Sequence, residues 1–331
     1  MSEKLEKVLC IFTGGTLAMD SETLSSLHSA DEILESVPEL KKIASIDCCQ
    51  LLNIDSVEMT PSLWVSIAQK IYDEYDIYYG FVVVHGTDTM VYTASAMSFL
   101  LRNLGKPVIF TGSQIPLHSY LASDARNNLI NAVRYALLDI AEVCIFFGSV
   151  LLRANRAKKV SGFDINAFRS FALDPLGHAG VKMSVSREAA HRSQSRPMLF
   201  KDLVEEVFLL KIYPSMSPSI FDILVQQGYK GIVLETFGTG NIPVGKNSLI
   251  PAIKNAIDSG MAIVVTSQCE MGFVEDIYPS GKMLKESGAV LAADMTVEAA
   301  LVKLMWVLGN ARNTREIRDL MQTPLANEFS V

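Results

Sequence analysis

The chain has 331 residues, of which 49% are hydrophobic and 20% charged, so it can bury more than one hydrophobic core. Its formal net charge of −7, with no long run of like charges, argues against a nucleic-acid-binding surface. The first apolar run has only five residues, shorter than a signal peptide's hydrophobic segment or a membrane span. We therefore expect a cytoplasmic protein that binds neither nucleic acid nor membrane.

Short apolar runs alternate with stretches of helical periodicity in the first half of the chain. We expect parallel strands at residues 8–12, 81–84, 107–110 and 143–147, and helices at residues 61–75, 89–102 and 124–138. The polar residues 153–160 are expected to form a hairpin beside the sheet edge. This alternation is typical of βαβ units, so it predicts a mainly parallel sheet covered by helices.

A second α/β series follows a stretch without clear periodicity, residues 186–205. Its expected strands lie at residues 206–212, 231–235 and 262–266, and its helices at residues 217–227, 247–258 and 296–308. We predict a larger N-terminal domain at residues 1–190, a linker at residues 191–205 and a smaller C-terminal α/β domain at residues 206–331. The five cysteines show no CxxC spacing, which favours buried reduced thiols over a metal site.

Two hydroxyl-rich turns each follow a predicted strand, TGGT at residues 13–16 and HGTDT at residues 85–89. The carboxyl ends of parallel strands meet at one edge of a sheet, so we expect both turns to share one pocket. A threonine hydroxyl needs a base before it can act as a nucleophile. His85 is a candidate base, although the end of a buried strand favours a neutral structural histidine. Asp88 is placed to cap the following helix.

These turns belong to a longer series of motifs: DSVEM at residues 55–59, TGSQIP at residues 111–116, Lys159, and DMTVEAALVKL at residues 294–304. Together they resemble the L-asparaginase family, in particular its cytosolic bacterial type I branch, over almost the full length. The resemblance implies a two-domain asparaginase-like fold and an amidohydrolase acting on a linear amide C–N bond. It would convert L-asparagine to L-aspartate and ammonia through a threonine acyl-enzyme, as a homodimer or homotetramer, without a metal or organic cofactor.

The resemblance also assigns roles to single residues. Thr16 matches the family's nucleophile, and Thr87, Asp88 and Lys159 match its proton relay. A partly desolvated lysine can accept a proton through a threonine hydroxyl; Lys158 is the alternative if the hairpin slips by one residue. The residues expected to bind substrate are Gly15, Asp55, Ser56, Val57, Gly86, Ser113 and Asn241. Asn241 would come from the C-terminal domain of a neighbouring chain, unless it is simply a turn residue.

Three positions depart from the family pattern. Family members usually carry a tyrosine on the lid after TGGT, but no tyrosine precedes Tyr72 here, and residues 19–28 form a short segment. The candidate replacements for that hydroxyl are Thr23, Ser25 and His28. Val57 stands where a polar residue often follows the serine, and Glu235 stands where some members carry an arginine of a regulatory asparagine pocket. Allosteric activation by asparagine is therefore not expected.

Three other interpretations remain. The ammonia-releasing subunit of a tRNA-dependent amidotransferase has similar motifs but usually an extra N-terminal domain, whereas TGGT begins at residue 13 here. A catalytically impaired amino-acid sensor would explain the missing lid tyrosine, but all four relay residues are retained. A nucleotide-phosphate loop is disfavoured because the first strand is followed by neither GxGxxG nor GxxxxGK[ST]. Preference between asparagine and glutamine does not follow from these motifs.

Overall fold

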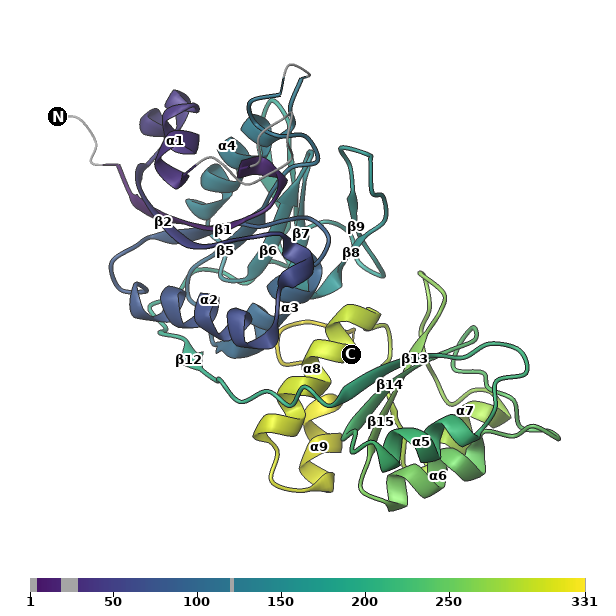
Figure 1. The fold of residues 1–331 in the computed structure, drawn as a ribbon. Coiled ribbons are helices and arrows are strands. Elements are labelled where there is room, and N and C mark those ends of the chain that lie inside the picture. Colours follow the sequence, from purple (N-terminus) through teal and green to yellow (C-terminus); the bar gives the residue numbers. More distant parts are fainter. Residues whose placement is uncertain (1–4, 19–28, 120–121, 331) are drawn as a thin grey trace. The chain divides into compact units, whose positions relative to one another are not determined.

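The computed structural model describes residues 5–18, 29–119 and 122–330. The chain divides into two compact units, unit 1 (Met1–Phe200) and unit 2 (Lys201–Val331) (Figure 1). The division falls within residues 191–205. In the part of the chain that is described, every helix is too short or too polar to cross a bilayer.

Unit 1 is built on an eight-stranded sheet with the spatial order β11-β10-β7-β6-β5-β3-β1-β2. Its parallel part contains the four predicted strands, which are β1 (Lys7–Gly14), β3 (Gly80–Val84), β5 (Val108–Thr111) and β6 (Val143–Phe147). It also contains β2 (Ser45–Ile54), which was not predicted and pairs in parallel with β1. Antiparallel pairing then adds β7 (Val150–Arg153), β10 (Gly177–Ala179) and β11 (Met183–Val185). The central strands are buried on both faces, which explains their continuous apolar runs.

Helices cover both faces of this sheet (Figure 1). On one face lie α1 (Ala30–Glu35) and α4 (Ala125–Ala136), whose apolar residues share a core with alternate residues of β1, Val8, Cys10 and Phe12. On the other face lies α3 (Met90–Leu100), against which α2 (Pro61–Asp73) packs. Pro61 begins α2, a position where its missing N–H costs no intrahelical bond.

Two short antiparallel pairs lie beside the main sheet. The first is a hairpin of β8 (Ala157–Lys159) and β9 (Phe168–Ser170). The prediction of a hairpin within residues 153–160 is wrong in its bounds, because Ala154–Arg156 form a 3₁₀ turn and the partner strand lies further along the chain. The second pair joins β4 (Leu101–Arg102) to β12 (Met198–Leu199), so the end of unit 1 packs back onto it. Arg192 adds to this packing, because its guanidinium donates to the carbonyl oxygens of Tyr79, Ala136 and Leu138.

Unit 2 has its own four-stranded parallel sheet, β13 (Val207–Lys211), β14 (Gly231–Thr236), β15 (Ala262–Ser267) and β16 (Val290–Leu291). Its helices are α5 (Ser219–Gln226), α6 (Ile250–Asp258), α7 (Pro279–Ser287), α8 (Val297–Asn310) and α9 (Thr314–Met321). A fully buried ion pair, Lys303 with Glu328 at 2.5 Å, fastens the C-terminal segment to α8. The predicted smaller α/β unit is thus present, with a core separate from that of unit 1.

All five cysteines are free thiols. Cys10 and Cys144 are buried as predicted, and burial raises the pKa of both thiols. The prediction of burial is wrong for Cys269, which is exposed, while Cys48 and Cys49 are half-buried. The latter two lie on β2, a strand at the edge of the sheet whose residues face solvent in part.

Candidate active site

Four neighbouring parallel strands, in spatial order β2, β1, β3 and β5, end at one edge of the unit 1 sheet. The loops that follow them surround one cavity of about 310 Å³. Its lining residues come from all four loops: Asp55 and Ser56 after β2, Gly15 and Thr16 after β1, Gly86, Thr87 and Asp88 after β3, and Gln114 after β5. The two hydroxyl-rich turns therefore share one cavity, as predicted from their place at the carboxyl ends of strands.

Glycines let three of these loops approach so closely that there is no room for a side chain between them. Gly15 has φ of +87°, and a Cβ added there would lie 2.4 Å from Cα of Gly86. A Cβ added at Gly86 would lie 2.6 Å from Oγ of Ser56. Only residues without a Cβ fit these two positions, so the loops converge at these glycines.

Lys159 reaches the cavity residues from the β8–β9 hairpin. Its Nζ donates to Oγ1 of Thr87 at 2.8 Å and to Oδ1 of Asp88 at 2.6 Å. The Lys159 side chain is 18% exposed, whereas that of Asp88 is 60% exposed. Of the two lysines that the sequence offered, the structure thus brings Lys159 to the turn. Lys158 precedes it on the same strand, where successive side chains point to opposite faces.

Gln114 is a lining residue that sequence reasoning did not single out. Its Oε1 accepts a hydrogen bond from the Thr87 hydroxyl at 3.2 Å. The signal that could have found it is its place in TGSQIP, because that motif directly follows a buried parallel strand whose carboxyl end faces the same edge.

The family models fit both halves of the chain. The asparaginase N-terminal model matches residues 7–191, and the glutaminase/asparaginase C-terminal domain model matches residues 206–321. The chain belongs to the asparaginase family.

The relatives of the chain carry different names. The chain is 40% identical over 342 residues to a glutamyl-tRNA(Gln) amidotransferase subunit of Pyrococcus abyssi, covering 98% of this chain and 77% of that protein. It is 35% identical over 336 residues to L-asparaginase 1 of Escherichia coli, covering 98% of each. The structure of the thermostable L-asparaginase from Thermococcus kodakarensis matches it with a TM-score of 0.92 at 32% identity, covering 98% of this chain and 99% of that chain. Membership of the asparaginase family supports hydrolysis of amide bonds.

His85 was the other candidate base in the sequence. It is 1% exposed, and its Nδ1 donates to the carbonyl oxygen of Gly86 at 2.7 Å. Burial lowers its pKa to about 4, so the ring is neutral near pH 7 and a weak base. The structural interpretation of His85 therefore holds. The prediction that Asp88 caps the helix is wrong. Thr89 is the N-cap residue of α3, and the Asp88 carboxylate accepts a hydrogen bond from Nζ of Lys159 instead.

Among the described residues that line the cavity, three predicted substrate-binding residues are absent: Val57, Ser113 and Asn241. Val57 is 60% exposed, and its backbone N–H donates to Oδ1 of Asp55. Ser113 is buried beside Gln114. Asn241 belongs to unit 2, where its Oδ1 accepts from Oγ of Ser280 at 2.8 Å. The candidate lid residues Thr23, Ser25 and His28 lie outside the described residues.

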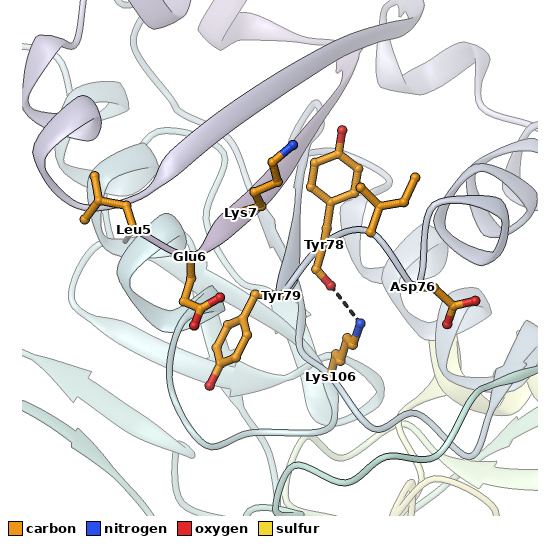
Figure 2. Close-up of a pocket in the computed structure, with 8 residues that line it drawn as sticks. Leu5, Glu6, Lys7, Asp76, Tyr78, Tyr79 and Lys106 are labelled. Carbon is orange, nitrogen blue, oxygen red and sulfur yellow. Dashed lines mark hydrogen bonds between the residues drawn. The ribbon is translucent and has the colours of Figure 1, made fainter. Parts of the chain in front are cut away.

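A second cavity, of about 390 Å³, lies where β1 and β3 begin, and Figure 2 shows Lys7, Tyr78, Tyr79 and Lys106 around it. Burial lowers the pKa of Lys106, but its Nζ already donates to the carbonyl oxygens of Tyr75 and Tyr78. The Tyr78 hydroxyl donates to Asp47. Lys106 and Tyr78 thus already have hydrogen-bond partners, and the described residues that line this cavity include no serine or threonine. The described residues contain no group of three His, Cys, Asp or Glu side chains arranged to hold a metal.

Proposed function

We propose that the protein is an L-asparaginase, converting L-asparagine to L-aspartate and ammonia through an acyl-enzyme on Thr16. One observation carries the proposal: the Lys159 amine lies 2.8 Å from the Thr87 hydroxyl and 2.6 Å from the Asp88 carboxylate. Thr87 and Asp88 line the same cavity as Thr16. A hydroxyl nucleophile needs a base within reach, and Lys159 in its neutral form supplies one through Thr87. We assign this chemistry to the proposed N-terminal domain, residues 1–190.

In the first half of the reaction, Oγ1 of Thr16 attacks the side-chain carbonyl carbon of asparagine. Its proton passes through the Thr87 hydroxyl to Lys159, and the tetrahedral intermediate forms with its charge on oxygen. Backbone N–H groups of Gly15 and of residues 86–88 are the proposed donors to that oxyanion. When the intermediate collapses, the C–N bond breaks and the proton returns to the leaving nitrogen, which departs as ammonia. An aspartyl ester on Thr16 remains.

In the second half, a water molecule attacks the ester carbonyl, and the same relay takes the water's proton. The C–O bond to Thr16 then breaks, the nucleophile recovers its proton, and aspartate is released. No step uses a metal or an organic cofactor. The relay thus acts once in each half of the reaction, which makes Lys159 and Thr87 needed throughout.

Carboxylates and small polar groups of the cavity are suited to the two charged ends of an amino acid. Asp55 and Asp88 offer negative charge to the α-ammonium group, and the Ser56 hydroxyl offers a hydrogen bond to the α-carboxylate. Val57 supplies no side-chain hydrogen bond of its own, so we expect weaker orientation of the amino end than a polar residue would give. The cavity's volume fits a small substrate.

A second candidate function is the release of ammonia from glutamine as one component of a tRNA-dependent amidotransferase. The 40% identity to a protein named as a subunit of glutamyl-tRNA(Gln) amidotransferase favours it. The same nucleophile and relay serve both reactions, and the two functions differ in substrate length and in the need for a partner chain. For the asparaginase we propose a cytoplasmic homodimer or homotetramer that needs no other partner.

The deciding experiment is the initial rate of ammonia release by the purified protein from asparagine and from glutamine, across substrate concentration. Rapid release from asparagine by the protein alone supports the asparaginase. Release from glutamine only after addition of a partner subunit and tRNA supports the amidotransferase. Saturable asparagine binding in calorimetry without any ammonia release would instead point to an amino-acid sensor.

A further inference from the structure

We propose that Gln114 is a positioning residue that fixes the Thr87 side chain and the direction of its hydroxyl proton. The inference rests on the proposed function for its catalytic consequence, since Thr87 belongs to the proposed relay. The geometric part of the inference stands by itself.

Contacts on both sides of Gln114 define its position. Its backbone N–H donates to the Asp124 carboxylate at 3.0 Å, which holds the loop after β5. Its side-chain Nε2 donates to the carbonyl oxygen of Asp164, in the β8–β9 loop, at 3.3 Å. A carbonyl only accepts, so the amide nitrogen must face Asp164 and Oε1 must face Thr87. The side chain therefore presents an acceptor, and not a donor, to the Thr87 hydroxyl.

The hydroxyl of Thr87 has a single proton, and its two partners decide where that proton lies. A charged Lys159 amine can only donate, so Oγ1 of Thr87 accepts from Nζ at 2.8 Å. The Thr87 proton then goes to Oε1 of Gln114 at 3.2 Å. With these two bonds, one on each side, the threonine is held in one rotamer with a lone pair toward the lysine. When Lys159 is neutral, rotation of the Thr87 hydroxyl about its C–O bond is enough to turn its proton from Oε1 of Gln114 to Nζ of Lys159.

This arrangement predicts a loss of rate without a loss of substrate binding when Gln114 changes. The proposal has the Oε1 atom act on the reaction through the Thr87 hydroxyl that it accepts from. We expect Gln114→Met, which keeps the length of the side chain, to lower kcat about 10- to 10²-fold through misalignment of the relay, with KM changed less than about threefold. Gln69→Met is the matched control: its Nε2 donates to Asp73 on α2, away from the cavity. That variant should keep the parent rate.

Gln114→Glu separates the acceptor from the tether to Asp164. A glutamate keeps an oxygen that accepts from Thr87 but loses the N–H that binds the Asp164 carbonyl. We expect its kcat to lie well above that of Gln114→Met. Equal losses in the two variants would make the tether the important contact and overturn the proposal. A raised KM with unchanged kcat in Gln114→Met would make Gln114 a substrate contact, which also overturns it.

A measurement without substrate tests the geometry itself. In protein with ¹³C-labelled threonine methyl groups, three-bond couplings report the χ1 rotamer of Thr87. We expect one rotamer in the parent and in Gln69→Met, and averaging among rotamers in Gln114→Met. A single Thr87 rotamer in Gln114→Met would show that Lys159 alone suffices and would overturn the proposal. Failure of the parent to release ammonia from asparagine or glutamine would count against the proposed function only, because the rotamer still decides the role of Gln114.

Discussion

Thr16 is half-buried in the loop after β1 and is the first residue of a 3₁₀ turn. We expect Thr16→Ala to abolish ammonia release while the protein stays folded, because the acyl-enzyme needs that oxygen and the exchange removes little buried volume. Steady-state assays together with thermal unfolding measure both effects. Thr60→Ala, an exposed threonine before α2 without a side-chain capping bond, is the control. A folded Thr16→Ala protein that kept about a tenth of the parent activity would move the nucleophile to Thr87 or to water.

The two adjacent lysines of β8 give a matched pair for testing the base. Lys159→Met should lower kcat by about 10²- to 10⁴-fold and affect substrate binding much less, since general-base assistance acts in the transition state. Lys158→Met should be nearly neutral. Loss of the ion pair with Asp88 should cost little stability, because that carboxylate is 60% exposed. Kinetic constants of both variants provide the measurement. Exchanged effects would mean that the register of β8 is shifted, and two neutral variants would remove lysine from the mechanism.

Residue types and spacing pointed to most of the cavity, but not to all of it. The two turns could be paired from the sequence because each follows a buried apolar strand. Gln114 could not be assigned a role, since its acceptor geometry depends on Asp124 and on the backbone of Asp164, contacts that exist only in the folded chain. The weak basicity of His85 likewise follows from its burial, which the strand pattern only suggested.

Elements that are buried on both faces were predictable, and those at the edge of the sheet were not. β3 and β5 are continuous apolar runs in the centre of the sheet. β2 was missed because it pairs only with β1, leaves most residues partly exposed and so lacks a clear apolar pattern. Yet β2 brings Asp55 and Ser56 to the cavity. The short antiparallel strands β10 and β11, of three residues each, owe their conformation to pairing and not to local preference.

The contact between the loops after β1 and β3 makes a prediction about glycine. Gly15→Ala places a methyl 2.4 Å from Cα of Gly86 at a residue with φ of +87°, so the two loops must separate. We expect loss of turnover and a lower unfolding temperature for unit 1. Gly162→Ala, in the β8–β9 loop with no atom within 4 Å of the added Cβ, should leave both unchanged. Calorimetry and ammonia release check the pair. Normal activity in Gly15→Ala would mean that this close approach is not needed for the site.

At the scale of the whole molecule, two cores lie in two units, and the chain between them is not a free linker. Loss of periodicity after residue 186 marked a change in the sequence, but it did not reveal how residues 191–200 pack. Arg192 donates to three carbonyl oxygens of unit 1, and Met198–Leu199 forms a strand pair with β4. The acceptors of these hydrogen bonds are backbone oxygens of segments far away in the sequence. The residues around Arg192 therefore give no pattern from which the contacts could be predicted.

The proposed homo-oligomer makes a last prediction about Asn241, which we propose closes the site of a neighbouring chain. Thr16→Ala and Asn241→Ala chains should each be poorly active. Co-refolded in equal amounts, they should recover about a quarter of the parent activity if pairing into two-fold dimers is random, because each mixed dimer then holds one complete site. Thr16→Ala mixed with Lys159→Met is the matched control. Thr16 lines the cavity of unit 1 and Lys159 bonds to Thr87 of the same cavity, so both belong to one chain's site and no mixed dimer contains a complete site. If the Asn241 mixture is no more active than the average of its two components, Asn241 does not serve a neighbour's site.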